Sequence, residues 1–386
     1  MRRHRIARFA TAALLLSLGA LAVACSEEPD AGGDDGAWPA VALTAVGKPP
    51  PLLSTTGLAR LENGALVYHP DLVPYELNMP LFSDYALKRR AFWVPPGKTI
   101  GWRPDGTLDF PEGSIIVKSF LFAADFREPE KNVRAIETRV LVRGAEDWKA
   151  WPYIWDATTG DATLEVGGHV ETIAFVDPEG QPREASYLVP QRNQCLDCHD
   201  QLREDEPHTT IIGPKARLLN RDNVYGGETV NQLEHFQKLG LLPDLPPIAQ
   251  VDRATSYDEI RATGVANLTG EALTRAARDY LDINCAHCHS PAGVEGNTSQ
   301  LFLHHDQDNP FLYGVCKAPS SAGKGGFGRK YDVVPGKPDD SILMYRLETT
   351  TLGAMMPDIG RSLEHTLGSQ LVRKWIEELP PVQCNR

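Results

Sequence analysis

Two copies of one short motif constrain this chain of 386 residues more than any other feature of its sequence. Each copy has two cysteines separated by two residues and followed directly by a histidine: Cys195-Leu196-Asp197-Cys198-His199 and Cys285-Ala286-His287-Cys288-His289. This is the spacing of covalent heme c attachment, because the two thiols add to the porphyrin vinyl groups and the adjacent histidine ligates the iron. The sequence therefore predicts two heme c groups, with His199 and His289 as axial iron ligands.

Two other chemistries use paired cysteines. In zinc ribbons the two pairs stand about 15–20 residues apart, whereas here the second pair begins 90 positions after the first, at Cys285 instead of Cys195. A thioredoxin-like redox pair requires a βαβ setting, but Cys285 follows a helical pattern. Heme attachment accounts better for both pairs and for the histidine that follows each of them.

The first half of the chain has the pattern of β-structure. The segments 114–122 and 138–143 are rich in β-branched and aromatic residues, and turn-forming prolines and glycines recur between such segments. Five of the seven tryptophans lie between Trp93 and Trp155, and we interpret them as core aromatics. These features predict a β-rich, sandwich-like domain over residues 49–189.

After about residue 190 the apolar residues recur at helical spacing. The expected helices cover 230–239, 269–285 and 367–379. A proline-rich stretch, 241–256, separates a first heme-binding segment over 190–250 from a second one over 265–384. The predicted fold class is therefore α+β and multidomain, with an N-terminal β-sandwich-like domain followed by mainly α heme domains.

The first 24 residues are typical of a secretory signal peptide. Arginines at positions 2, 3, 5 and 8 precede an apolar run over 9–24, which is shorter than the about 20 residues of a membrane-spanning helix. The sequence Leu21-Ala-Val-Ala-Cys25 resembles the lipobox of bacterial lipoproteins, which implies lipidation of Cys25. The alternative is simple cleavage that leaves a periplasmic protein. Residues 25–48 are acidic and poor in apolar residues, so we expect a flexible linker.

The charge balance argues against nucleic acid as a partner. The chain carries 39 basic and 51 acidic residues, a net charge of −12, and removal of the four leader arginines would take this to −16. Nucleic-acid binding depends on a basic surface. We therefore expect a protein partner and, through the lipid anchor, a membrane.

Two cysteines remain outside the motifs and the lipobox, namely Cys316 and Cys384. An even remainder in an oxidising, exported compartment predicts a disulfide between them. The neighbouring pair His304 and His305 is interpreted as a solvated loop pair.

The C-terminal segment resembles a bacterial class I cytochrome c domain. The residues that carry this resemblance are Asn284-Cys-Ala-His-Cys-His289, Pro335 to Leu343, Met356-Pro357 and Trp375-Ile376. Nearly the whole mature chain resembles a family of exported diheme c-type cytochromes with a β-rich front domain. The further segments that carry this resemblance are Asn78 to Tyr85, Gln194 to His199, Ile212 to Arg217 and Asn231 to Leu233. The resemblance implies heme binding and electron transfer.

In cytochrome c domains a methionine on a loop before the last helix binds the iron opposite the histidine. The resemblance therefore implies Met356 as the ligand opposite His289, with Met355 as the second choice. The ligand opposite His199 stays open. The candidates for it are His208, His235, His169 and Met79.

The expected function is electron transfer through two covalently attached hemes, exchanged with a redox partner protein. Two alternatives remain. One is an oxidoreductase similar to diheme peroxidases, in which one heme keeps an open iron position. The other is a binding module whose hemes relay electrons from a partner dehydrogenase. An exported, periplasmic and membrane-anchored lipoprotein is the expected location.

Overall fold

The computed structural model describes residues 38–43, 47–104, 106–293, 298–320 and 323–384. The predicted signal peptide 1–24, the predicted lipidation site Cys25 and most of the linker 25–48 lie outside these residues. Residues 39–386 form one compact unit, which is described below. Within the described part of the chain, each helix is too short or too polar to cross a membrane.

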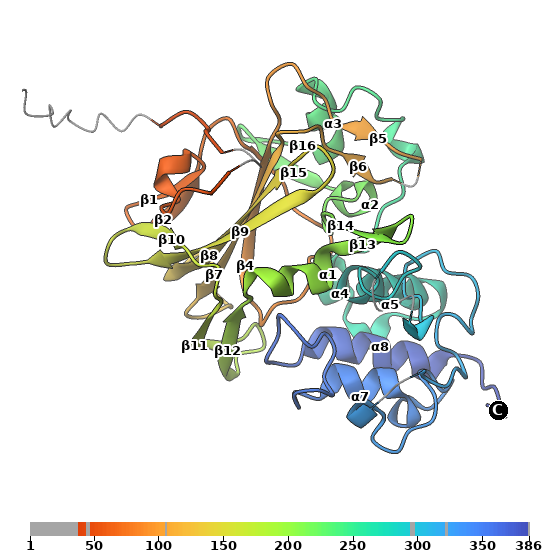
Figure 1. Ribbon diagram of the computed structural model, residues 1–386. Helices are drawn as coiled ribbons and strands as arrows, with labels where there is room; N and C mark the ends of the chain where they lie inside the picture. The colour runs from red at the N-terminus through yellow and green to blue at the C-terminus, as the bar shows by residue number, and fades with distance from the viewer. Residues whose placement is uncertain (1–37, 44–46, 105, 294–297, 321–322, 385–386) are drawn as a thin grey trace, which may run out of the picture. The chain divides into compact units, whose positions relative to one another are not determined.

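The largest element of the fold is a six-stranded antiparallel sheet with the strand order β10-β9-β8-β7-β4-β3 (Figure 1). Its strands are β3 (Val73–Pro74), β4 (Leu87–Trp93), β7 (Ile115–Ala123), β8 (Val133–Arg143), β9 (Trp148–Asp156) and β10 (Asp161–Leu164). The remaining strands form five two-stranded hairpins: β1 (Ala59–Glu62) with β2 (Ala65–Tyr68), β5 (Gly101–Trp102) with β6 (Leu108–Asp109), β11 (His169–Val176) with β12 (Pro182–Val189), β13 (Asp200–Arg203) with β14 (Glu206–Thr209), and β15 (Asp222–Tyr225) with β16 (Glu228–Asn231).

Both faces of the large sheet are covered by other parts of the chain. Successive side chains of a strand point to opposite faces, so neighbouring residues of β7 pack against different neighbours. In β7, Ile115 and Val117 pack on one face together with residues of β1 and β2, whereas Ile116 on the other face packs toward the helices. Phe120 and Phe122 pack against the β11–β12 hairpin. Burial on both faces explains why β7 reads as a nearly continuous apolar run.

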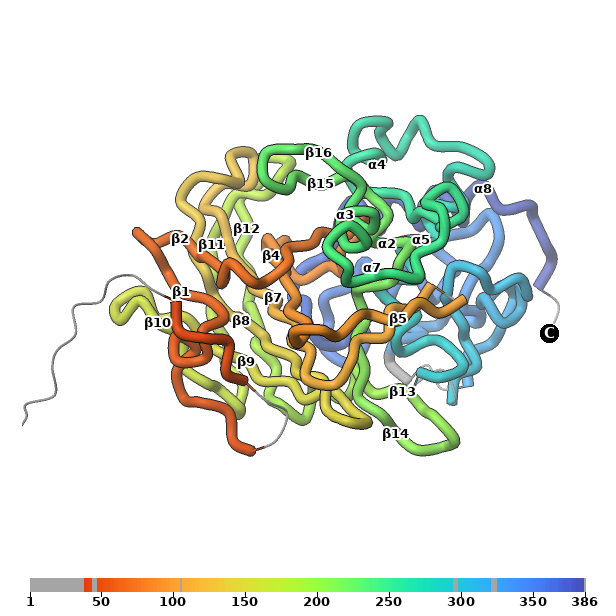
Figure 2. The backbone as a smooth tube through the Cα atoms, turned by 90° about the horizontal axis from the view of Figure 1, so that it is seen from above, coloured from red at the N-terminus to blue at the C-terminus, as the bar shows by residue number. Residues whose placement is uncertain are grey.

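The helices are α1 (Leu196–His199), α2 (Ala216–Leu219), α3 (Gln232–Lys238), α4 (Tyr257–Thr263), α5 (Gly270–Cys285), α7 (Ile342–Glu348) and α8 (Thr366–Glu378). Short 3-10 turns cover Ser54–Thr56, Arg192–Cys195, Ile248–Gln250, Val265–Asn267, Gly323–Gly326 and Pro338–Asp340. In both views α5 and α8 lie on the side away from β1, β2 and β10 (Figures 1 and 2). The apolar face expected for 269–285 is buried in α5, as the helical spacing predicted.

The fold is α+β, but two of its expected details differ from the structure. The predicted sandwich over 49–189 has one large sheet with two-stranded hairpins against its faces, instead of two sheets of similar size. The predicted mainly α segment 190–250 contains two hairpins besides its helices. Each hairpin turns on two residues with positive φ, Glu204-Asp205 and Gly226-Gly227, the geometry that two-residue hairpin loops prefer.

The predicted segment boundaries do not divide the core. One cluster of buried side chains extends from the sheet, at Phe92 and Ile116, through Phe236 of α3 to Tyr280 of α5 and Trp375 of α8. Of the five tryptophans expected in the core of the β half, Trp148, Trp151 and Trp155 are buried, whereas Trp93 and Trp102 are partly buried and pack against the core clusters. Side chains from both halves of the chain therefore stabilise the same core.

A network of buried amide side chains ties distant segments together. Gln232 donates from Nε2 to the carbonyl of Glu76 at 3.0 Å, and Asn78 donates to the carbonyl of Asn220 at 3.1 Å. Asn220 in turn donates to the carbonyl of Val251 at 2.9 Å. Because buried polar groups require partners, these three amides fix how the loop around α2 packs beside the sheet.

Candidate functional site

The first cysteine motif follows the large β-rich region directly. Cys195 ends a 3-10 turn, and the one-turn helix α1 presents Cys198 and His199. The Nδ1 atom of His199 lies 2.7 Å from the carbonyl oxygen of Thr210. This hydrogen bond fixes the ring and leaves Nε2 for a metal. Burial lowers the pKa of His199, which favours the neutral imidazole that ligates metals.

The second motif begins at the last residue of α5, where the helix delivers Cys285. The amides of Cys288 and His289 both donate to the carbonyl of Cys285, at 3.1 and 2.8 Å, so the motif continues as a tight turn. The Nδ1 atom of His289 lies 3.5 Å from Oγ of Ser299, which again leaves Nε2 for a metal. Burial lowers the pKa of His289 to about 4 and raises the pKa of Cys285 to about 12.

Each motif opens onto its own cavity. The first cavity is lined by Cys195, Cys198 and His199 together with residues of β7, β8 and β9. The second is lined by Cys285, Cys288 and His289 together with apolar residues of α7. The cavity volumes are about 140 Å³ at the first motif and about 480 Å³ at the second. The cysteines and the histidine of each motif thus line a common cavity, and the volume of the second cavity lies within the about 300–1,000 Å³ of small-molecule pockets.

The second cavity contains the methionine expected for it. Met356 lines this cavity together with His289. Met355 is buried with 4% exposure and lines neither cavity, and Met344 is a core residue with 1% exposure. The structure therefore distinguishes the two adjacent methionines: only Met356 shares a cavity with His289.

None of the four candidates for the ligand opposite His199 lines the first cavity. Met79 is fully buried in the core. His208 bonds Asp147 through Nδ1 at 2.9 Å, and His235 stacks on a tyrosine ring. His169 is an exposed residue at the start of β11. The ligand opposite His199 therefore stays open, and none of the four candidate side chains lines the cavity of His199.

Cationic side chains on the large sheet form one wall of the first cavity, and sequence reasoning missed them. Arg90, Lys118 and Arg139 all line it. Burial lowers the pKa of Lys118 well below its usual value, and the nearby arginines lower it further. Arg139 pairs with the buried Glu137, 2.6 Å away, which also accepts from the hydroxyl of Tyr187 at 2.6 Å. The available signal was a lysine inside the apolar run of β7.

The second cavity also carries charged groups. Lys317 and Asp332 line it, and their Nζ and Oδ2 atoms lie 3.6 Å apart. Both residues are buried, and burial raises the pKa of Asp332 to about 6. Arg346 of α7 lines the same cavity. A bound anionic group would therefore meet two cations here.

The two motifs lie close to each other. One ligand atom from each of Cys198, His287 and Cys288 lies within 4.8 Å of the others. Hydrogen bonding from Cys288 lowers the pKa of Cys198, although burial opposes this, and His287 lowers it further. These three residues form the only group of three or more His, Cys, Asp or Glu side chains with metal-binding spacing in the part of the chain that the structure describes.

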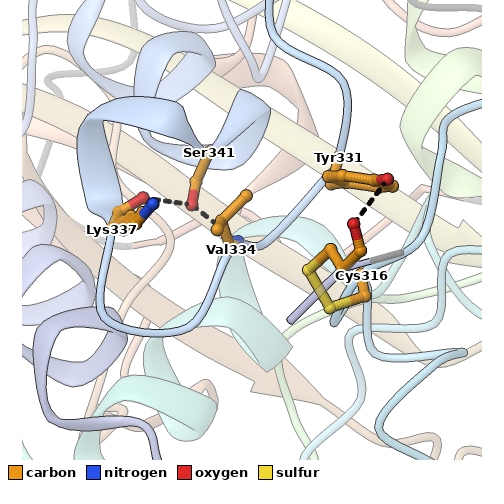
Figure 3. Close-up of a disulfide and its surroundings, with 6 residues drawn as sticks. Cys316, Tyr331, Val334, Lys337 and Ser341 are labelled. Carbon is orange, nitrogen blue, oxygen red and sulfur yellow. Dashed lines mark hydrogen bonds between the residues drawn. A yellow bond between two sulfur atoms is a disulfide. The ribbon is translucent and has the colours of Figure 1, made fainter. Parts of the chain in front are cut away.

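The structure contains a disulfide between Cys316 and Cys384, the pair that the sequence predicts (Figure 3). The hydroxyl of Tyr331 donates to the carbonyl of Cys384 at 3.0 Å. His304 and His305 lie on the preceding loop and are partly exposed. The disulfide thus fastens the C-terminal tail beside the segment that lines the second cavity.

We compared the chain with models of known protein families, with curated proteins and with solved structures. None of the three comparisons gave a match.

Proposed function

We propose that this protein is a diheme c-type cytochrome that transfers electrons. One heme attaches to Cys195 and Cys198, and the other to Cys285 and Cys288. The observation that carries the proposal is that each motif faces its own cavity. In each motif, in addition, Nδ1 of the histidine has a nearby oxygen partner, which leaves Nε2 for iron.

The two irons then have different surroundings. In the second site Met356 completes the pair with His289, and a thioether ligand raises the reduction potential of heme iron. The helices α5, α7 and α8 are proposed to be a cytochrome c domain, and the β-rich region is proposed to cover the first heme. Export, a lipid anchor at Cys25 and a redox partner protein complete the proposal.

The decisive experiment is to express the chain with a heme-maturation system and measure its intact mass. We expect a mass increase of two hemes. The double variant Cys285→Ala/Cys288→Ala should carry one heme. The matched control Cys316→Ser/Cys384→Ser also removes two cysteines but should keep both hemes. A wild-type protein without covalent heme refutes the proposal.

Spectra then test the iron ligands. Met356→Ala should lose the far-red sulfur-to-iron charge-transfer band of the ferric protein, whereas Met355→Ala should keep it because that side chain lies outside the cavity. Carbon monoxide tests the first site. Binding to one ferrous heme in the wild type would favour the peroxidase-like alternative, because an electron carrier needs no open iron position.

A second candidate function is binding of a thiophilic metal ion by the unmodified thiols. The observation that favours it is the spacing of Cys198, His287 and Cys288, whose ligand atoms lie within 4.8 Å, since thiolate and imidazole together suit zinc or copper. The two candidates exclude each other, because thioether formation consumes both thiols. Metal analysis of the same preparation separates them: about one zinc or copper per chain with free thiols supports the metal site.

A further inference from the structure

The two candidate heme cavities share a wall. Cys198, His287 and Pro357 each line both cavities. Cys198 belongs to the first motif and His287 to the second, while Pro357 follows Met356 on its loop. Each site is therefore bounded in part by residues of the other.

Hydrogen bonds from β13 hold the two motifs in this arrangement. Leu202 of β13 donates to the carbonyl of Ala292 at 2.7 Å, and the side chain of Gln201 donates to the carbonyl of His287 at 3.1 Å. The strand after the first motif thus binds the loop that contains and follows the second, so the closeness of the motifs does not depend on one contact.

We infer that the two hemes form a single electron-transfer unit, joined edge to edge at the thioether sulfurs of Cys198 and Cys288. This inference depends on the proposed attachment of heme at both motifs. Each thioether sulfur is bonded to a carbon next to the porphyrin ring, and the sulfurs of Cys198 and Cys288 lie within 4.8 Å of each other. One edge of each porphyrin therefore reaches this junction.

The step that the junction performs is a one-electron exchange. With hemes attached at both motifs, Cys198 and Cys288 would hold the two porphyrin edges together, so that one heme would give up an electron and be oxidised while the other would accept it and be reduced. No bond is formed or broken, no proton moves, and no further reactant is required. His287 lies at the junction with 8% exposure, and its buried Nδ1 has no hydrogen-bond partner among the described residues. Its ring lies between the two sites, because His287 lines both cavities.

Circular dichroism in the Soret region tests this arrangement. Two hemes with adjacent edges couple their transitions, so the wild-type protein should give a two-signed signal. The matched single-heme variants are Cys195→Ala/Cys198→Ala and Cys285→Ala/Cys288→Ala, and the sum of their spectra should lack it. A wild-type spectrum equal to that sum overturns the inference.

A kinetic measurement on the wild type alone keeps the test decisive if a variant does not fold. The protein is reduced rapidly with one electron per molecule, and redistribution between the hemes is followed at two concentrations. We expect a rate that is unchanged on tenfold dilution. A rate that falls tenfold means that electrons pass between molecules, which overturns the inference but leaves the proposed function intact if the mass shows two hemes. Absence of covalent heme refutes both.

Discussion

Arg217 is a buried cation that joins α2 to α5. Its guanidinium bonds Asp279 and Asp252 and lies 3.5 Å from Oδ2 of Asp282. The side chains of Asp279 and Asp282 are each 1% exposed, and that of Arg217 is 9% exposed. Replacement of Arg217 therefore removes the cation paired with the buried carboxylate of Asp279 and one of the cations beside the buried carboxylate of Asp282.

The expected loss can be estimated from this burial. Arg217→Met keeps the apolar stem and removes the charge, and breaking a buried ion pair from one side costs about 3–5 kcal/mol of unfolding free energy. Arg275→Met is the matched control. Arg275 pairs with the same Asp252 at 2.6 Å, but its side chain is 50% exposed, so we expect a loss of about 0–1 kcal/mol.

Urea unfolding of the two variants beside the wild type, followed by tryptophan fluorescence, measures the difference. Arg217→Met should lower the unfolding midpoint well beyond Arg275→Met at neutral pH. Burial raises the pKa of Asp282, but Lys215, His305 and Arg217 lower it more, so the net pKa is below its usual range. Loss of Arg217 raises this pKa, and protonation of the carboxyl at low pH then removes the unpaired charge.

The deficit of Arg217→Met should therefore be largest near neutral pH and should narrow in acid. Two results would refute this reasoning. One is an equal loss of stability in Arg217→Met and Arg275→Met. The other is a deficit of Arg217→Met that grows as the pH falls.

Three further predictions concern stability. Cys316→Ser/Cys384→Ser removes a disulfide between residues 68 positions apart, and the chain-entropy relation gives a loss of about 4 kcal/mol in the free energy of unfolding. The wild type should lose the same amount when a reductant is added, whereas the stability of the double variant should not change with reductant. Burial raises the pKa of Asp332 from 3.8 to about 6. The protonated carboxyl therefore stabilises the fold fully below pH 3.8, and this contribution to the free energy of unfolding, at most about 3 kcal/mol, is lost as the pH rises through about 6. Asp332→Asn should flatten the stability profile across that window, and an unchanged slope would contradict the assignment. His365 stacks on Phe82 with ring centroids 4.3 Å apart, and its buried Nδ1 has no hydrogen-bond partner among the described residues. Because the ring contributes by packing, His365→Phe should change the free energy of unfolding by less than about 1 kcal/mol, whereas His365→Ala should lower it by several times more.

Several features of the fold and of the candidate site could be predicted from residue type and spacing in the sequence. The two cysteine motifs are read from five residues each, and the pair Cys316 and Cys384 from what remained after the other cysteines were assigned. The burial of Ile116 and Phe120 follows from the apolar run of β7. The helix that ends at Cys285 follows from its 3.6-residue period. The disulfide joins residues 68 positions apart and followed from the count of the remaining cysteines; each of the other features depends on residues within a few helical turns or strand positions.

The sequence by itself determined the chemistry expected at each motif: thiol spacing, an adjacent histidine, and a methionine before the last helix. Only the tertiary structure decided which groups meet. It brings Met356 instead of Met355 into the cavity of His289, lines the cavity of His199 with Lys118 and Arg139, and puts Cys198 beside Cys288. The physical reason is the distance along the chain over which each effect acts. Covalent spacing acts within one motif, whereas cavity walls depend on packing between segments far apart in the chain.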